Sequence, residues 1–573
     1  DFIQRGIKMK RRVSTFALVF AICAALLCLG ASAAAPQSNY SIWVCGALVT
    51  DGNASDILDD GGSVSYDVES NTLILNGAEL KDTSYYAVII SQLDSINILL
   101  VGDNVIAASE TTSYSDSNVA ALYSSGEITI SGSGTLAADS KGSGYPVIYS
   151  ASALKIGGDA SVKVTANEGS MGIFAQGSTS DVELSGNADV TVITSSNTGI
   201  YAEGNVIISE NANVSVDVDG SGTALAADEA INISGGSVYA TSATGNAMYA
   251  VTGGIHISDG YTEAVSESAR PAVNAPGIVE ITGGELRAEA WGNIAIQATN
   301  EHDPFGEFVV TNAKVTAISH PVGSTNPPPA IYAPADIRIT NSEVYAESEG
   351  YGMYSNTTID LTGSAVDVIS ATDWAMASRG LNIDNSAVRA RSPEGNDAIY
   401  ILGAMGVDDS WIDCIGTITV TDAYELTDSV VIINGSGQAA GDAVVPDGTI
   451  LDETKVLTVP SGTTLTVPVG TTFTNNGTIV VESRAQLVNR GTINNNDEII
   501  ISTNAALGNY GEIANEGEID LGGQLEGEGE ITGSGIVRRP TGNLPTSHDI
   551  ELTVSGGGEA LLSLNNASAG ATI

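Results

Sequence analysis

Eight aromatic residues recur at one position of a repeated phrase, and their chemistry suits contact with sugars. Each follows an apolar residue of a short expected strand, and successive side chains of a strand alternate between its two faces. The rings should therefore point outward in one column, about 4.8 Å apart. Sugar rings present C–H faces that stack on flat aromatic rings, so such a column could follow an extended polysaccharide. The residues of this predicted column are Tyr123, Tyr149, Phe174, Tyr201, Tyr249, Tyr332, Tyr354 and Tyr400.

The same column also has a purely structural interpretation. Stacked like residues stabilise the faces of β-helices without any ligand. The chain has only 19 Tyr, 7 Phe and 4 Trp, so chance does not explain the clustering of eight of them at one phase of a repeat. Glycan contact and structural stacking both stay open at this point.

Carboxylates are the second group that could do chemistry, because Ca²⁺ takes six to eight oxygen ligands from Asp, Glu and backbone carbonyls. Calcium is therefore the cofactor we expect, although none of the acidic groups has the spacing of a known calcium loop, and solvated turns are the alternative. The predicted metal ligands are Asp408, Asp409 and Asp413, with further acidic groups at Asp56, Asp59 and Asp60 and at Asp217 and Asp219.

Catalytic constellations are sparse. Glu301, His302, Asp303 and His320 could meet as a metal site, but they fall in inserted loops, for which a plain surface role is the alternative. The chain has four His, widely scattered, and no Gly-His-Gly segment, whereas sugar-cleaving β-helices need clustered acids together with His and Lys or Arg. Asp408-Asp409 alone is a weak paired-carboxylate signal. We therefore expect no enzymatic activity, with a polysaccharide lyase kept as an alternative.

The elements that must position these residues are short strands in a long repeat. Each copy has three apolar phrases in which apolar and polar residues alternate, which is typical of half-buried strands. Ten of the eleven spacings between anchors are 22 to 27 residues, and the eleventh is 35. Three strands per repeat of ~25 residues predict an all-β parallel β-helix of about 12–13 coils. The anchors are Leu122, Ile148, Ile173, Ile200, Leu225, Met248, Val273, Ile296, Ile331, Met353, Met376 and Ile399.

A second repeat follows the first with a different rhythm. Ile479, Ile499 and Ile519 are 20 residues apart, and Asn-x-Gly-x-Ile phrases put turn formers beside strand anchors. This pattern predicts a smaller β-solenoid. The predicted organisation is 1–35 signal peptide with an upstream extension, 36–70 N-terminal cap, 71–420 parallel β-helix, 421–455 irregular connection, 456–540 second solenoid, and 541–573 linker and truncated start of a further module.

The N-terminus reads as an export signal, and the charge excludes some partners. Met9 to Arg12 form a basic flank, Phe16 to Leu29 an apolar run, and Ala31 to Ala33 a small-residue cleavage site. We expect a secreted or surface-bound product without membrane insertion in the mature chain.

The net charge of −47 argues against binding to nucleic acid. Cys45 and Cys414 are too far apart in the repeat array for a disulfide.

The stretch from Asn71 to Val101, with Ala-Ile-Tyr-Ala at 330–333 and phrases of the Ile-x-Ile-Thr-Gly-Gly type, resembles a bacterial family of secreted carbohydrate-binding β-helices. The resemblance covers roughly residues 71 to 420. It implies the shape of a polysaccharide lyase, binding of cellulose and polygalacturonate, and bound calcium, whose ligands it does not map onto particular residues here. Residues 42–49 and 62–75 look like the lead-in module found before such helices.

Together these patterns predict noncatalytic binding of a plant-type polysaccharide through the aromatic column, assisted by Ca²⁺, by a monomeric secreted or surface protein. If the glycan is acidic, two polyanions must meet, and Ca²⁺ would have to bridge their carboxylates. The alternative from another class is a structural adhesin or stalk that displays a C-terminal module.

Overall fold

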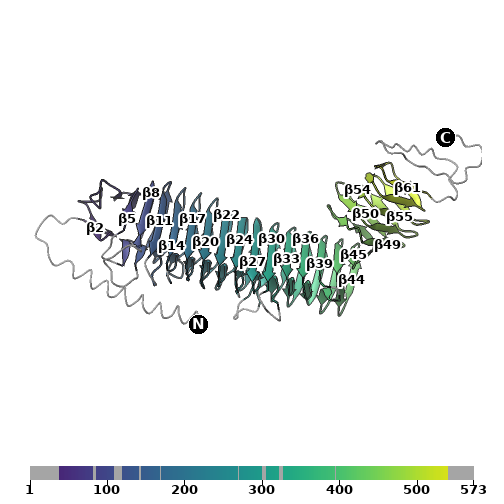
Figure 1. Ribbon diagram of the computed structural model, residues 1–573, viewed down its shortest axis with the longest axis horizontal. Coiled ribbons are helices and arrows are strands. Elements are labelled where there is room, and N and C mark those ends of the chain that lie inside the picture. The colour runs from purple at the N-terminus through teal and green to yellow at the C-terminus, as the bar shows by residue number, and fades with distance from the viewer. Residues whose placement is uncertain are drawn as a thin grey trace, which may run out of the picture.

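The computed structural model describes residues 38–81, 86–108, 119–140, 144–167, 169–268, 270–299, 305–321, 327–393 and 395–539. Within them the chain is all-β, without helices, and forms a parallel β-solenoid of about 18 turns, as Figure 1 shows. The fold-class prediction is therefore confirmed. The predicted export signal at 1–35 and the predicted module at 541–573 lie outside the described residues, as do Glu301, His302 and Asp303.

The first sheet holds one strand of every coil of the long solenoid. Its strands are short and parallel from β6 onward, and their anchors point into the core. In order along the sheet they are β2 (Ala47–Thr50), β1 (Asn39–Val44), β6 (Ala87–Ser91), β9 (Ala120–Ser124), β12 (Ile148–Ser150), β15 (Ile173–Ala175), β18 (Ile200–Ala202), β21 (Leu225–Ala227), β23 (Met248–Ala250), β25 (Val273–Asn274), β28 (Ile296–Gln297), β31 (Ile331–Ala333), β34 (Met353–Ser355), β37 (Met376–Ser378), β40 (Asp397–Ile401) and β43 (Thr417–Val420).

The second face of the solenoid is formed by the middle strand of each coil. Two of its strands, β22 and β24, run around the corner into the third face, so that these two faces join as one sheet. The strands are β3 (Val64–Asp67), β4 (Thr72–Asn76), β7 (Ser95–Val101), β10 (Glu127–Gly132), β13 (Leu154–Ile156), β16 (Val182–Leu184), β19 (Val206–Ile208), β22 (Ile231–Ser242), β24 (Ile255–Ser266), β26 (Ile278–Ile281), β29 (Glu307–Thr311), β32 (Ile337–Thr340), β35 (Thr358–Thr362), β38 (Gly380–Asp384), β41 (Met405–Asp408) and β44 (Tyr424–Thr427).

The third face shows most clearly why the sequence forms strands. In β33, Val344, Ala346 and Ser348 are buried, while the residues between them face outward, because side chains alternate at period two. Besides the second halves of β22 and β24, the strands are β5 (Glu79–Leu80), β8 (Asp103–Ala107), β11 (Thr135–Ser140), β14 (Ser161–Ala166), β17 (Asp189–Thr194), β20 (Asn213–Val218), β27 (Glu285–Trp291), β30 (Lys314–His320), β33 (Glu343–Ser348), β36 (Ala365–Ser370), β39 (Ala387–Arg391), β42 (Trp411–Ile415) and β45 (Val430–Ile433).

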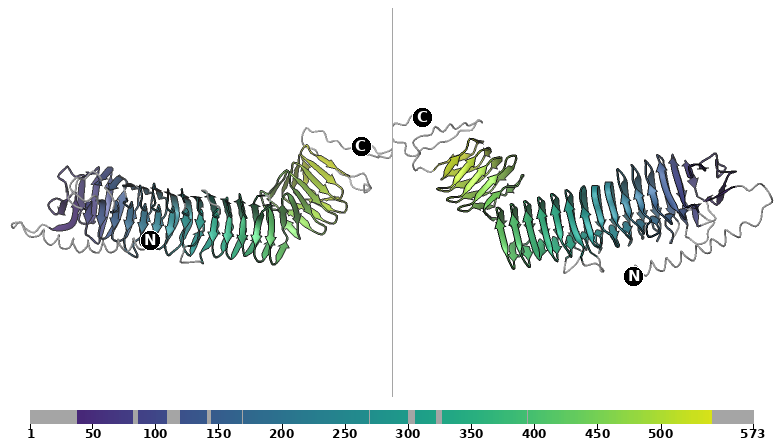
Figure 2. Two further views of the ribbon diagram at one scale, coloured as in Figure 1. Left: turned by 60° about the horizontal axis from the view of Figure 1, so that its bottom comes forward. Right: turned by 180° about the vertical axis from the view of Figure 1, so that it is seen from behind.

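The second solenoid also has three faces, one of which continues a sheet of the first solenoid, and it stands at an angle to the first in Figures 1 and 2. Ile479, Ile499 and Ile519 stack in register, as the 20-residue rhythm predicts. One face is β46 (Ser436–Ala439), β49 (Val456–Val459), β52 (Thr478–Val481), β55 (Glu498–Ile501), β58 (Glu518–Leu521) and β61 (Ile536–Arg538); the others are β47 (Asp442–Val444), β50 (Thr464–Val467), β53 (Gln486–Asn489), β56 (Ala506–Asn509) and β59 (Gln524–Glu526), and β48 (Ile450–Leu451), β51 (Thr472–Asn475), β54 (Thr492–Asn495), β57 (Glu512–Asn515) and β60 (Glu530–Thr532).

The two solenoids share one sheet, whose buried side changes at the junction. In β42, Ile412 and Cys414 pack in the core of the first solenoid, whereas Trp411 packs in the core of the second. The next strand, β45, pairs in parallel with β42 and in antiparallel with β46, so the strand direction reverses there. Because strand direction and core side both reverse, the chain keeps one winding sense through both solenoids.

Antiparallel strands cover the N-terminal end of the first solenoid. β1 pairs antiparallel with β6, and β3 pairs antiparallel with β4, so the first coil does not leave its edges open. No disulfide joins Cys45 to Cys414, in agreement with the prediction. Within the described residues, the structure contains no helix of the length and apolar character that crossing a bilayer needs.

Candidate functional site

All eight predicted aromatic residues occupy one register column on the outer face of the first sheet. Tyr149 pairs with Tyr123 and with Phe174, and the same correspondence continues coil by coil to Tyr400. Their neighbours on either side in each strand, such as Ile148, point into the core. The column reads Tyr123, Tyr149, Phe174, Tyr201, Ala226, Tyr249, Asn274, Gln297, Tyr332, Tyr354, Ala377 and Tyr400.

The N-terminal part of this column is packed ring on ring. Tyr123 and Tyr149 stack with centroids 4.8 Å apart, and Phe174 and Tyr201 stack at 5.0 Å with planes 4° apart. Tyr149 is only 6% exposed and Phe174 only 3%. These two rings offer no free face to a sugar, which corrects the expectation that the whole column is a binding surface. The physical reason is that neighbouring rings and turns cover the outer face here, which strand parity does not reveal.

Tyrosine hydroxyl groups in the N-terminal part of the column form hydrogen bonds to neighbouring turns. The Tyr201 hydroxyl donates to Asp228 Oδ1 at 2.7 Å, and the Tyr149 hydroxyl donates to Gln176 Oε1. Burial raises the pKa of Tyr201, and the hydrogen bond to Asp228 raises it further. The phenols therefore stay protonated and hold the turns that follow the next strands against the sheet.

The C-terminal part is a patch of five half-buried rings, here called the aromatic patch: Tyr332, Tyr351, Tyr354, Trp374 and Tyr400. Tyr332 and Tyr354 are nearly parallel, with planes 12° apart and centroids 5.5 Å apart. Parallel rings at that distance are laterally offset, so part of each face stays uncovered. The patch can therefore offer flat apolar surface to a ligand.

Trp374 and Tyr351 lie outside the predicted column but extend the patch. Trp374 stacks on Tyr400 with centroids 4.0 Å apart, and so puts a ring beside the place where the column has Ala377. Tyr351 stacks on Tyr354 at 5.2 Å. The predicted column includes neither residue. A usable signal existed, because each is an aromatic residue three positions before a column residue.

Coils between the two parts interrupt the column. Tyr249 lies between Ala226 and Asn274 in register, and Gln297 follows. The eight residues therefore do not form one continuous ring surface. Five coil steps of about 4.8 Å separate Tyr201 from Tyr332, or roughly 24 Å.

The structure groups the predicted metal ligands differently. Carboxylate oxygens of Asp408, Asp409 and Asp428 lie within 4.8 Å of one another, whereas Asp413 bonds to Lys455 and is buried. Asp413 is thus not available to a metal, which corrects its assignment. Asp413 is part of β42, on the sheet shared by both solenoids, while Asp409 lies in the turn before it.

A ladder of serines explains why Asp409 and Asp428 meet. Each precedes a buried serine and has a positive φ, 46° and 44°, which Asn and Asp tolerate better than most residues. The amide of Ser410 donates to Ser429 Oγ at 2.9 Å, which locks the two turns in register. Asp409-Ser410 and Asp428-Ser429 repeat the same dipeptide in successive coils. This repeat could have indicated that the two aspartates meet, whereas the spacing of acidic residues within a single turn could not.

The three carboxylates of this acidic group lie close enough for their charges to interact. Burial and the neighbouring carboxylates of Asp408, Asp428 and Asp384 raise the pKa of Asp409. Three carboxylates at this distance repel one another, and a divalent cation would relieve the repulsion. Asp408, Asp409 and Asp428 are therefore the residues that could hold Ca²⁺.

His320 belongs to a different arrangement from the predicted one. Its ring stacks on Trp291 with centroids 4.1 Å apart, and its Nε2 lies 2.8 Å from Glu289 Oε1. Arg287 contacts the same carboxylate group. These contacts satisfy Glu289 and His320 as a surface network of aromatic and charged groups.

Comparison with known protein families gives a match. A family model described as "Carbohydrate-binding domain-containing protein" matches residues 54–174 and 172–374, which together make up more than half of the chain. Neither the curated proteins nor the solved structures contain a match.

Proposed function

The chain belongs to the family of carbohydrate-binding domain-containing proteins, and from this premise we propose that it binds an extended polysaccharide without cleaving it. The observation that carries the proposal is the aromatic patch, where five half-buried rings follow consecutive coils. Flat apolar rings suit the C–H faces of sugars, and the coil rise lets one chain contact several rings. The buried N-terminal rings, by contrast, stabilise the stacking of the coils.

Replacing Tyr332, Tyr354 and Tyr400 together with Ala should weaken retention on an insoluble polysaccharide about a hundredfold, since three stacking contacts of about 1 kcal/mol each are lost. Retention is measured by depletion from solution over a panel of plant-type glycans. The matching Tyr→Phe triple variant keeps the rings and should bind nearly as well as wild type. Tyr424→Ala with Tyr510→Ala, two exposed rings outside the patch, should change nothing.

Undiminished retention by the Ala variant would contradict the role of the patch. The rival function is then a structural adhesin or stalk, which the length of the solenoid in Figure 2 favours. A lyase would be revealed by unsaturated sugar products that absorb in the ultraviolet. Secretion or surface attachment, which the predicted export signal motivates, is tested by fractionating cells that express the full chain.

Calcium is proposed as an aid to binding, with Asp408, Asp409 and Asp428 as its ligands. Asp428→Asn should lower Ca²⁺ affinity about tenfold in calorimetric titration, because it removes a charge while its Oδ1 can still accept the amide of Asp442. Asp422→Asn, an exposed neighbour, is the control. Chelation should release the protein from polygalacturonate, where two polyanions must be bridged. Chelator-insensitive retention with no calcium heat would reject this part of the proposal.

A further inference from the structure

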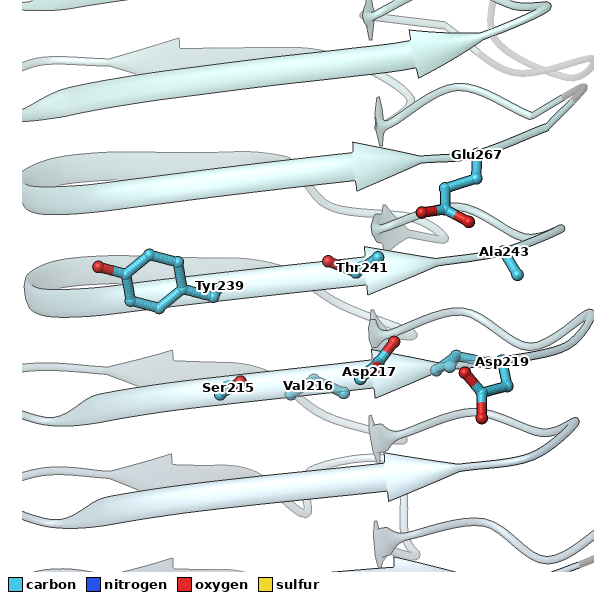
Figure 3. Close-up of a pocket in the computed structure, with 9 residues that line it drawn as sticks. Ser215, Val216, Asp217, Asp219, Tyr239, Thr241, Ala243 and Glu267 are labelled. Atoms are coloured by element: carbon cyan, nitrogen blue, oxygen red, sulfur yellow. The ribbon is translucent and has the colours of Figure 1, made fainter.

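A hollow of about 300 Å³ lies on the outer surface of the third face, away from the aromatic patch (Figure 3). It spans β20, β22 and the turn after β24, and so draws on three successive coils. Ser215 pairs in register with Tyr239, and Asp217 pairs with Thr241. Asp219 and Glu267 close the hollow at the end where the strands leave the face.

One end of the hollow is aromatic. Tyr239 is 41% exposed, which makes it one of the most accessible rings of the described residues. Tyr261 of the next coil lies 5.8 Å away with its plane tilted by 50°, and this contact holds the Tyr239 ring without covering it. A free aromatic face next to the hydroxyls of Ser215 and Thr241 suits a polyhydroxylated ring.

The other end is acidic. Asp217, Asp219 and Glu267 form no salt bridge with any Lys or Arg of the described residues. Partial burial raises the pKa of Asp217, and the charge of Asp219 raises it further. A positively charged group placed here would relieve both effects.

These carboxylates do not converge as metal ligands. Among the described residues, the carboxylate oxygens of Asp408, Asp409 and Asp428 lie within 4.8 Å of one another, whereas those of this trio do not. The acids of the hollow line a wider space, with an aromatic ring about two to four strand residues away, or roughly 7–13 Å. That spacing fits an organic ligand with a cationic end and an apolar face.

We propose that this hollow binds adjoining sugar units bearing protonated amines, as in a polymer of glucosamine. The C–H face of one unit stacks on Tyr239, its hydroxyls bond to Ser215 and Thr241, and the ammonium of an adjoining unit lies among Asp217, Asp219 and Glu267. This inference rests on the proposed function only in taking the chain to bind carbohydrate, and it names a second site with its own sugar class.

Calorimetric titration with a glucosamine hexamer tests the site, and the fully N-acetylated hexamer is the neutral control of equal length. At about pH 5.5, where Asp and Glu are largely ionised and the amine is protonated, wild type should bind the glucosamine hexamer about tenfold or more tightly than the acetylated one. Asp217→Asn with Asp219→Asn should remove that preference, and Tyr239→Ala should weaken binding of the hexamer.

Matched variants separate this site from general attraction between a polycation and a chain of net charge −47. Asp94→Asn with Glu229→Gln removes the same charge from exposed positions elsewhere and should leave the affinity unchanged. Equal loss in this control, or equal affinity for the two hexamers, would overturn the inference. The Tyr332, Tyr354 and Tyr400 Ala variant should still bind the glucosamine hexamer. If the triple Ala variant no longer binds neutral glycans but still binds the glucosamine hexamer, the aromatic patch and the acidic hollow are separate sites. If the Asp217, Asp219 and Tyr239 variants bind the glucosamine hexamer like wild type, the inference about the hollow is wrong, and the proposed function of the aromatic patch is unaffected.

Discussion

Replacing Lys455 with Met is expected to destabilise the junction between the two solenoids by about 3–5 kcal/mol. Lys455 Nζ bonds to Asp413 Oδ2 and lies 2.6 Å from Asp452 Oδ2, and the Lys455 and Asp413 side chains are 10% and 9% exposed. The other oxygen, Asp413 Oδ1, is buried without a hydrogen-bond partner in the described residues. Met keeps most of the volume, so the loss comes from leaving the buried Asp413 carboxylate with only the longer contact to Arg389, whose Nε lies 3.8 Å from Asp413 Oδ2.

The stability of a solenoid is approximately a sum of terms between neighbouring coils. The destabilisation caused by Lys455→Met should therefore be largest in the coils next to the junction. Hydrogen exchange in β42, β45 and β49 should accelerate, and the urea transition that includes the second solenoid should move to lower concentration. Lys314→Met removes an exposed contact to Glu285 at 3.9 Å and should cost less than about 1 kcal/mol. Adding Asp413→Asn to Lys455→Met should restore much of the stability. A Lys455 variant as stable as the Lys314 variant would mean that this ion pair does not hold the junction.

Asn495→Ala should destabilise the second solenoid by about 2–4 kcal/mol. Asn495 is completely buried; its Nδ2 donates to Asn515 Oδ1 at 2.7 Å, and its Oδ1 accepts from Asn475 Nδ2 at 2.7 Å. Alanine leaves the amide of Asn475 and the carbonyl of Asn515 buried without these partners. The midpoint of unfolding in urea, followed by circular dichroism on the full chain, reports the change.

The neighbouring residue provides the control for this prediction. Asn496 is exposed and bonds to Asn476 Oδ1 at 2.8 Å, so Asn496→Ala should change stability by no more than about 0.5 kcal/mol. Equal tolerance of alanine at the two positions would show that the amide ladder contributes little. A parallel ladder, Asn489 to Asn509 at 2.8 Å, predicts the same contrast at Asn489.

These asparagines show which features a repeat pattern predicts and which it does not. The Asn-x-Gly-x-Ile phrases predict turn formers beside strand anchors, and Asn489 and Asn509 do end strands β53 and β56. The sequence did not indicate that their amides are buried and bonded to one another. Only stacking of the coils decides that, because each amide finds its partner 20 residues away and out of water.

The sequence by itself determined that the chain forms repeated coils, and it determined which side chains of each strand face outward. Strand side chains alternate at period two, and anchors recur every 22 to 27 residues, so an aromatic residue after each anchor must share one outer column. The register of Tyr123 with Tyr149 and of Tyr332 with Tyr354 follows from this arithmetic. The repeat length and the alternation of side chains along a strand can both be determined from neighbouring residues, because the backbone geometry of a strand sets the alternation.

The tertiary structure decided what lies over and beside each residue. Parity puts Phe174 and Tyr354 on the same face, but packing buries the first and leaves the second half exposed. Asp413 pairs with a lysine 42 residues away because the sheet changes its buried side at β42, and Asp428 joins Asp409 because two turns stack. Distances between coils depend on how the chain closes around its core, and no spacing along the sequence contains that information.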